Sequence, residues 1–163
     1  MSGETRPLLL ADFEEVSDLG WFSVDDGVMG GRSSGGFRIE HGALVFSGTT
    51  NTNGGGFSSI RTQPRLPSLQ GREAILLTAQ GDGRCYVLRL ESHDGVAYWA
   101  EFQPAVGVAS SIRVPLADFR PRFRGRWLAG PPIEAGRIVA LGIMCYDGRD
   151  GPFRLEVSRI EAE

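Results

Sequence analysis

The stretch Ala74–Phe102 reads AILLTAQGDGRCYVLRLESHDGVAYWAEF and consists of three short apolar segments separated by glycine-containing turns. The segments are Ala74–Gln80, Arg84–Glu91 and Ala97–Phe102. Each has the length of a strand, and the Asp-Gly pairs between them are typical of tight turns. The stretch therefore predicts consecutive antiparallel β-strands.

Apolar and polar residues alternate in the middle segment of this stretch. Tyr86, Leu88 and Leu90 share one face, whereas Arg89 and Glu91 point to the opposite face. We therefore expect a strand with one face in the core and the other facing outward.

Strand signals continue through the whole chain of 163 residues. The further candidates are Phe37–Glu40, Ala43–Gly48, Phe57–Thr62, Ser111–Val114, Ile138–Tyr146 and Phe153–Val157. The 23 glycines and 9 prolines are scattered, and Leu8–Leu19 is the longest run without either. About eight to ten short strands predict an all-β fold, an antiparallel sandwich or jelly roll, as one domain over residues 1–163. The only helix candidate is a short one near Phe13–Leu19.

Composition excludes several classes of chemistry. All 17 basic residues are arginine, so lysine-dependent Schiff-base, P-loop and kinase chemistry is absent. The formal net charge of −3 argues against generic wrapping of nucleic acid. The two histidines leave little room for a histidine-rich metal site, and we expect neither a metal nor a cofactor; a structural cation near Asp25-Asp26 is the alternative. We expect Cys85 and Cys145 to be buried free thiols.

The longest apolar stretch near the N-terminus is Leu8–Ala11, far shorter than a secretory leader or a membrane span. The sequence thus favours a cytoplasmic, bacterial protein with no membrane insertion, no targeting segment and no fused domain.

Three patterns that resemble catalytic motifs have simpler explanations. Gly31–Gly35 matches G-x-S-x-G but lacks the strand-to-helix turn that this motif needs. His93-Asp94 belongs to a turn, and the adjacent carboxylates of Asp25-Asp26 point apart on an extended chain. We therefore predict no catalytic residues and no enzymatic activity.

Two segments suggest ligands other than protein. Arginines and aromatic residues alternate in Arg120–Trp127, so RNA could be contacted through Arg113–Arg126. A surface loop with arginines paired to the acidic N-terminal segment is the favoured alternative. Trp21, Tyr98 and Trp99 could form a sugar-stacking platform, although such aromatic residues more often lie in the core.

The sequence also resembles a known family. A D-D-x-V-M-G-G-x-S run at residues 25–33 is followed by G-G-F-x-S-x-R at residues 55–61, and this combination is specific. Similar segments occur in order at Leu10–Phe13, Trp21–Ser33, Phe46–Gly48, Asn53–Arg61, Gly81–Tyr86, Tyr98–Phe102, Val114–Phe119, Phe123–Gly125 and Gly151–Val157. Over residues 10–160 the chain resembles the complex I intermediate-associated protein family.

This resemblance implies a galactose-binding-like jelly-roll sandwich without known catalytic activity. Members resemble assembly factors that hold subunits of respiratory or photosynthetic membrane complexes, so a protein partner is expected. This chain has Ala109-Ser110 where the family usually has a tryptophan, which puts any aromatic contact there in doubt. A carbohydrate-binding module is the alternative at the level of fold.

The shared positions define a candidate binding cluster. Its members are Asp25, Asp26, Ser33, Asn53, Phe57, Ser59, Arg61, Arg84, Tyr86 and Tyr98. We expect one face to carry Arg61, Arg84, Tyr86 and Tyr98, next to the loop Asp25–Ser33. Because an arginine on a sandwich face needs a carboxylate, Asp25 or Asp26 is the expected partner. The cluster is either a buried ion pair that clamps the first loop or, less favoured, the floor of a ligand groove.

Overall fold

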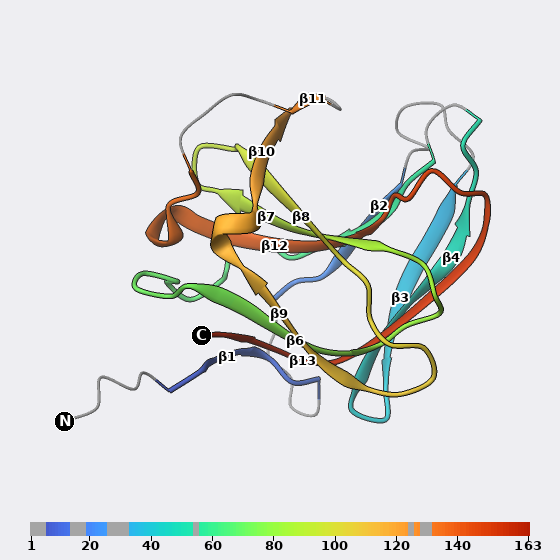
Figure 1. Cartoon of the computed structure of the whole chain (residues 1–163), viewed down its shortest axis with the longest axis horizontal. Helices are drawn as coiled ribbons and strands as arrows, with labels where there is room; N and C mark the ends of the chain where they lie inside the picture. Colours follow the sequence, from blue (N-terminus) through green and yellow to red (C-terminus); the bar gives the residue numbers. More distant parts are fainter. Residues whose placement is uncertain (1–5, 14–18, 26–32, 54–55, 124–125, 128–131) are drawn as a thin grey trace.

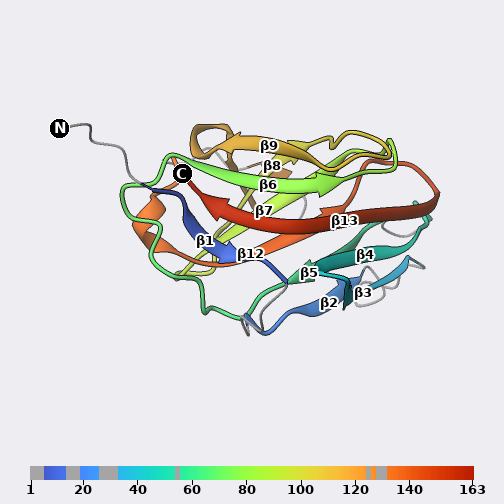
Figure 2. The ribbon, with the colours of Figure 1, turned by 90° about the horizontal axis from the view of Figure 1, so that it is seen from below.

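Two antiparallel sheets stack face to face in the computed structural model, which describes residues 6–13, 19–25, 33–53, 56–123, 126–127 and 132–163. In Figure 1, β7, β8 and β12 of one sheet lie above β1, β6 and β13 of the other. Figure 2 shows the second of these sheets from its outer side, with β9, β6 and β13 side by side. The all-β jelly-roll prediction is confirmed.

Sheet 1 has the strand order β3-β4-β13-β6-β9, and β1 also pairs with β13. Its strands are β1 (Leu8–Ala11), β3 (Ser34–Glu40), β4 (Ala43–Thr50), β6 (Ala74–Gln80), β9 (Ser110–Pro115) and β13 (Gly151–Ala162). The β3–β4 turn is formed by His41 and Gly42, with φ of 53° and 72°. Two consecutive left-handed residues match the twist of a two-residue hairpin, as the sequence predicts.

Sheet 2 has the order β11-β10-β8-β7-β12-β5-β2. Its strands are β2 (Phe22–Asp25), β5 (Ser58–Arg61), β7 (Tyr86–Ser92), β8 (Ala97–Phe102), β10 (Arg120–Phe123), β11 (Arg126–Trp127) and β12 (Ile138–Cys145). Two short 3-10 helices, η2 (Leu116–Asp118) and η3 (Ala135–Arg137), precede β10 and β12.

The segment after Phe119 and the helix candidate near Phe13–Leu19 differ in how they compare with the sequence predictions. The segment after Phe119 is not a surface loop, because Arg120–Phe123 and Arg126–Trp127 are strands of sheet 2. The helix candidate near Phe13–Leu19 falls largely on residues 14–18, outside the described residues. In the part of the chain that is described, no helix has the length and apolar character to cross a membrane.

The core lies between the two sheets. Phe46, Leu155 and Leu77 of sheet 1 and Leu88 and Ile143 of sheet 2 are each 0% exposed. Every second residue of these strands points into this layer, which explains the alternation seen in the sequence.

A second group of residues is buried on the opposite, outer side of sheet 2. Val87, Ala97, Ala140 and Met144 are buried but do not belong to the core cluster between the sheets. Their strand positions alternate with core positions, so they point outward. Something other than sheet 1 must therefore cover them, and this covering layer contains the candidate site.

Candidate binding surface

Strand pairing places six residues in one row across sheet 2. Successive partners across strands β2, β5, β12, β7, β8 and β10 are Phe22, Arg61, Gly142, Arg89, Trp99 and Arg120. Directly opposite residues of antiparallel strands project to the same side. Ile60 and Leu88, each next to a row member, point into the core, so the row lies on the outer face.

Arg61 lies near the centre of this row and is half-buried. Its Nε atom is buried and has no hydrogen-bond acceptor among the described residues. Burial, together with the nearby positive charge of Arg89, lowers the pKa of Arg61 to about 10, although Glu91 opposes this shift. The guanidinium is therefore still charged at neutral pH.

Gly142 makes room for the Arg61 side chain. A Cβ atom at position 142 would lie 3.2 Å from Arg61 Cγ and 3.0 Å from the Ile60 carbonyl oxygen. The aliphatic part of Arg61 thus passes over a strand position that holds no side chain, toward Arg89 on the other side.

Arg89 is already paired. Its Nη2 atom lies 3.0 Å from Glu91 Oε1, two residues further along β7. The neighbouring Arg61 has no carboxylate within ion-pair distance in the described part of the chain. Two arginines and one carboxylate leave this part of the face with a net positive charge.

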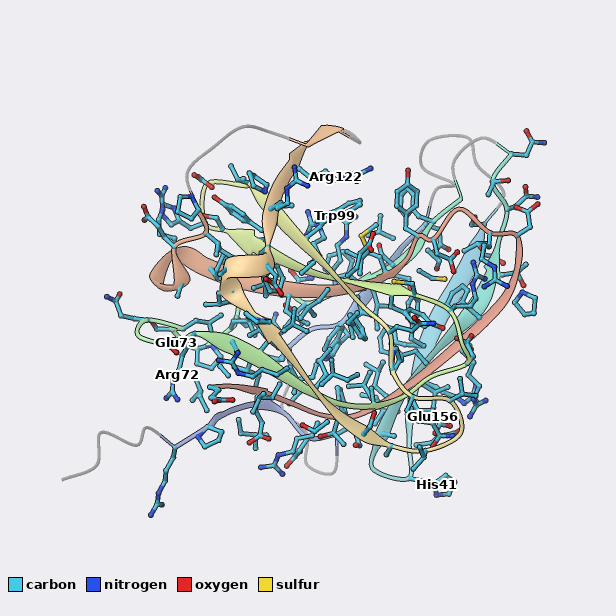
Figure 3. The ribbon with its side chains drawn as sticks, viewed as in Figure 1. His41, Arg72, Glu73, Trp99, Arg122 and Glu156 are labelled. Carbon is cyan, nitrogen blue, oxygen red and sulfur yellow. The ribbon has the colours of Figure 1, made fainter. Side chains whose placement is uncertain are left out.

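Aromatic rings lie beside the arginines. The Tyr146 ring meets Phe57 at a centroid distance of 6.1 Å and Trp99 at 5.8 Å, both edge to face. The Arg122 guanidinium lies 4.3 Å from the centroid of the Trp99 ring and 5.6 Å from that of Tyr146. Figure 3 shows Trp99 and Arg122 together on the side of sheet 2 away from sheet 1. These long side chains lie on the same side of sheet 2 as Val87 and Met144.

We refer to this surface as the arginine–aromatic face. It comprises Phe22, Phe57, Arg61, Arg89, Glu91, Trp99, Arg122 and Tyr146. Planar guanidinium groups bind carboxylates and stack on rings, so this set can hold an anionic group flanked by apolar surface.

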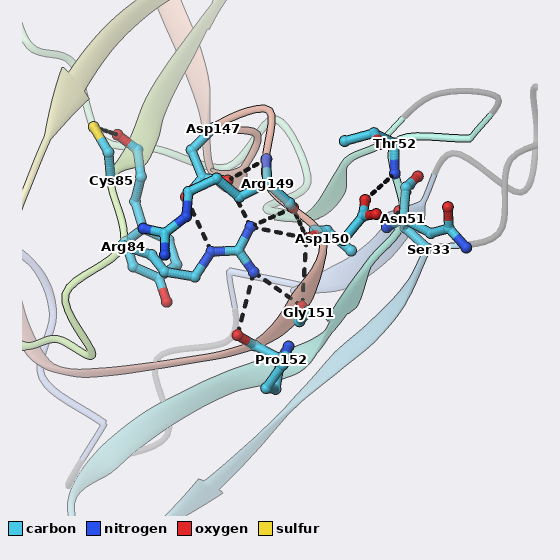
Figure 4. Close-up of polar contacts among 12 residues, drawn as sticks. Ser33, Asn51, Thr52, Arg84, Cys85, Asp147, Arg149, Asp150, Gly151 and Pro152 are labelled. Carbon is cyan, nitrogen blue, oxygen red and sulfur yellow. Dashed lines mark hydrogen bonds and ion pairs between the residues drawn. The ribbon is translucent and has the colours of Figure 1, made fainter.

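A separate polar cluster surrounds Arg84, between the start of β7 and the loop that joins β12 to β13 (Figure 4). The guanidinium binds both carboxylate oxygens of Asp147, at 2.9 Å and 2.5 Å. It also donates to Thr50 Oγ1 and to the carbonyl oxygens of Arg149, Gly151 and Pro152. Arg84 is only 6% exposed, and its hydrogen-bonding groups are directed to internal partners.

The expected pairing of Asp25 with an arginine is wrong. Asp25 accepts hydrogen bonds from Ser58 Oγ at 2.6 Å and from the Gly35 backbone N–H at 3.2 Å. Arg84 instead pairs with Asp147, so this buried ion pair clamps the loop after β12. Asp26 lies outside the described residues.

The expectation that Arg61, Arg84, Tyr86 and Tyr98 share one exposed face is also wrong. Tyr86 is 0% exposed, and its hydroxyl donates to Asp82 at 3.0 Å. Burial and the charge of Asp82 raise the pKa of this phenol. Tyr98 packs against the core, so only Arg61 of the four lies on the arginine–aromatic face.

The other predicted residues hold local structure or join this face. Ser33 Oγ accepts a hydrogen bond from the Asn51 N–H at 2.8 Å, and the Asn53 N–H donates to Asn51 Oδ1. Ser59 is fully buried and donates to the Val24 carbonyl oxygen. Phe57 lies on the arginine–aromatic face. Their role in binding stays a prediction.

The three aromatic residues that were considered for sugar stacking do not lie on one surface. Trp21 packs against Phe13 with ring centroids 6.2 Å apart, and Tyr98 also points toward the core. Only Trp99 points outward, as its pairing with Arg89 requires.

Sequence reasoning missed Tyr146, Arg122 and Gly142 as members of the site. Arg89 and Glu91 were predicted to point outward but were not included either. The alternation in β7 could have identified them, because it places the charged residues Arg89 and Glu91 on the outer face of the sheet, where a ligand can bind.

The basic segment Arg113–Arg126 does not form a single surface in the described part of the chain. Arg113 lies on β9 of sheet 1, 3.5 Å from Glu163, whereas Arg120 and Arg122 lie on β10 of sheet 2. Cys85 and Cys145 are free thiols, but only Cys145 is buried as expected, whereas Cys85 is half-buried. Among the described side chains, no group of three or more His, Cys, Asp or Glu residues is arranged to hold a metal ion.

Comparisons with known proteins agree with this architecture. The family model described as complex I intermediate-associated protein 30 matches residues 11–157. No curated protein matches the sequence.

Several solved structures have the same fold. A family 11 carbohydrate-binding module from Clostridium thermocellum, in complex with a β-1,3-1,4-mixed-linked tetrasaccharide, is 18% identical over 96% of this chain and 94% of its own, with a TM-score of 0.67. The family 11 module of the cellulase Lic26A-Cel5E from the same organism is also 18% identical, over 98% and 95%, with a TM-score of 0.69. The agarase AgWH50C is 15% identical over 96% of this chain but 24% of its own, with a TM-score of 0.62. At these low sequence identities, the comparison with the solved structures shows a shared fold only.

Proposed function

This chain belongs to the complex I intermediate-associated protein 30 family, and on that premise we propose that it is a non-catalytic binding module that holds a protein partner during assembly of a larger complex. The family name points to assembly of a membrane respiratory complex, and the partner is then a subunit or assembly intermediate of such a complex. The arginine–aromatic face is the contact surface in this proposal.

The composition of that face carries the proposal. Trp, Tyr and Arg side chains dominate the energetically important positions of protein interfaces. Here Trp99, Tyr146, Arg122, Arg61 and Arg89 lie together over a floor of small or apolar residues. Phe22 extends the surface at the β2 edge and is 38% exposed. Rings held edge to face are already ordered, which reduces the entropy lost on binding.

The two histidines have local structural roles. His41 forms the β3–β4 turn, and His93 lies beyond the end of β7, where its Nε2 accepts a hydrogen bond from Arg137. Neither histidine belongs to the arginine–aromatic face.

Affinity capture tests the proposal. The tagged chain, its Arg61→Ala variant and an Arg38→Ala control are used to capture proteins from extracts of the source organism. Arg38 is an exposed arginine of sheet 1 that pairs with Glu40, so its removal changes net charge equally on the other sheet. We expect one reproducible partner that is lost with Arg61→Ala and kept with Arg38→Ala. Capture of nothing would contradict the binding role. Equal capture by all three chains would contradict the assignment of the contact to the arginine–aromatic face.

Carbohydrate binding is the second candidate function. Phe57, Trp99 and Tyr146 share one face, and a module of the same fold has been solved with a tetrasaccharide. However, the Arg122 guanidinium lies over the Trp99 ring at 4.3 Å and occupies a face on which a sugar would stack. This contact makes protein binding the better supported function.

Affinity electrophoresis in gels that contain mixed-linkage β-glucan or agarose tests the second candidate. Retardation that disappears in the Trp99→Ala variant would support sugar binding. Unchanged mobility in both gels would remove it.

RNA contact through Arg113–Arg126 is a third hypothesis. It is less well supported because the described arginines of this segment are divided between the two sheets. It requires an affinity that falls steeply as salt increases. Binding that is insensitive to salt, or no binding to single-stranded RNA, would exclude it.

A further inference from the structure

We propose that Arg61 is the receptor for a carboxylate group of the partner, so that the partner presents an acidic side chain or its C-terminus to the centre of the arginine–aromatic face. This inference rests on the proposed function and names the chemistry of what is bound.

The first argument is hydrogen bonding. A guanidinium carries five N–H donors, and buried donors are normally satisfied. Arg84 shows how completely this chain satisfies an internal arginine, with one carboxylate, one hydroxyl and three carbonyl oxygens. Arg61 Nε is buried without an acceptor in the described part of the chain. The Nη atoms of Arg61 are not enclosed in this way and form no hydrogen bond with the described residues. An external carboxylate would therefore bind at the Nη atoms, and Nε would gain an acceptor only if the side chain shifts.

The second argument is charge. Arg61 and Arg89 both occupy positions opposite Gly142, and among the described residues Glu91 is the carboxylate that acts on both. Glu91 is bound to Arg89 at 3.0 Å, so in the described part of the chain Arg61 has no carboxylate of its own within ion-pair distance and feels Glu91 only from further away. One additional negative charge would neutralise the group.

The third argument selects the type of anion. The planar guanidinium fork matches the two oxygens of a carboxylate. A phosphate dianion would bring a second negative charge close to Glu91, and the Glu91 carboxylate would repel this charge. Phe22 and Trp99 flank the two arginines in the same row, so apolar groups next to the carboxylate would be buried as well. An acidic residue with apolar neighbours fits all three features.

The test uses the full chain labelled with ¹⁵N at arginine, and the Nε–H signals are followed by NMR. Sodium acetate, sodium phosphate and sodium chloride are titrated separately at constant ionic strength. We expect the Arg61 signal, assigned by its absence in Arg61→Gln, to shift saturably with acetate and to shift less with phosphate. The same titration on Arg38→Gln should leave the Arg61 response unchanged.

Two outcomes would overturn the proposal. A linear shift, equal for all three salts, would show that Arg61 has no anion site. Stronger saturation with phosphate would assign the site to a phosphorylated ligand and not to a carboxylate.

Partner capture separates this inference from the proposed function. If the wild-type chain captures a partner and Arg61→Gln captures it equally well, a partner carboxylate at Arg61 is excluded while the binding role stands. If no partner is captured, the binding role fails, and the acetate titration still decides whether Arg61 binds a carboxylate.

Discussion

Arg84 holds both carboxylate oxygens of Asp147, and the two side chains are only 7% and 8% exposed. Asp147 directly follows Tyr146, whose ring lies between Phe57 and Trp99 on the arginine–aromatic face. The ion pair therefore fixes the loop that positions the central ring of the candidate site. Although Arg84 does not contact a ligand in our proposal, it supports the surface that does.

Removal of the Asp147 charge should destabilise the whole domain. Asp147→Asn leaves the Arg84 charge buried without a counterion, and loss of one partner of a buried pair costs about 3–5 kcal/mol. The loss of stability is measured as the decrease in the free energy of unfolding, obtained by urea denaturation. Glu40→Gln is the control, because the Arg38–Glu40 pair is about half exposed and should cost less than about 1 kcal/mol. Equal effects of the two variants would contradict this account.

The same ion pair predicts a dependence of stability on pH. Burial alone would raise the pKa of Asp147, but the hydrogen bond and charge of Arg84 outweigh it and lower the pKa below the ordinary value of 3.8. The folded state thus binds this proton less readily than the unfolded state, so the stabilisation is complete above pH 3.8 and is lost as pH falls through the folded-state pKa. Asp147→Asn should show a flatter decline of unfolding free energy below pH 4. An unchanged slope would contradict the assignment.

Gly142→Ala should weaken acetate binding without removing any charge. The added Cβ would meet Arg61 Cγ at 3.2 Å and the Ile60 carbonyl oxygen at 3.0 Å, so the arginine must shift by a few tenths of an ångström. Gly36→Ala is the matched control, because the atom nearest to a Cβ there is Ser23 Oγ at 3.9 Å. We expect the acetate affinity measured by NMR to be at least several-fold weaker for Gly142→Ala and unchanged for Gly36→Ala. Equal affinities would show that the position of Arg61 is unimportant.

Acetate binding should not vary between pH 6 and 9. Arg61 keeps its proton until its pKa of about 10, a value that burial and the charge of Arg89 lower and that Glu91 opposes. Affinity should fall as the pH rises above about 10, because the neutral guanidine no longer attracts an anion. A midpoint near pH 6.5 would instead implicate a histidine.

The sequence was sufficient to predict most strands. The strands β6 and β8 have the bounds that alternation predicts, and the β3–β4 hairpin has its turn at His41-Gly42. These elements depend on local periodicity and turn chemistry. The strand β10 was missed because its four residues, Arg120–Phe123, include three arginines or prolines and show no apolar alternation.

The site was harder to predict, because its contacts connect residues far apart in the chain. Arg84 and Asp147 are 63 residues apart, and no local pattern distinguishes Asp147 from Asp25 as a partner. By contrast, the alternation that placed Arg89 outward also placed Tyr86 inward. Grouping Tyr86 with Arg61 therefore contradicted a pattern that was already visible.

Site-specific photo-crosslinking tests the central claim most directly. Phe22 and Ile39 are exposed apolar residues on strands β2 and β3, at the edges of sheet 2 and sheet 1, so each is replaced in turn by p-benzoylphenylalanine. The arginine–aromatic face predicts a covalent partner adduct from position 22 that disappears when Arg61→Gln is added, and none from position 39. An adduct from position 39 alone would contradict the claim.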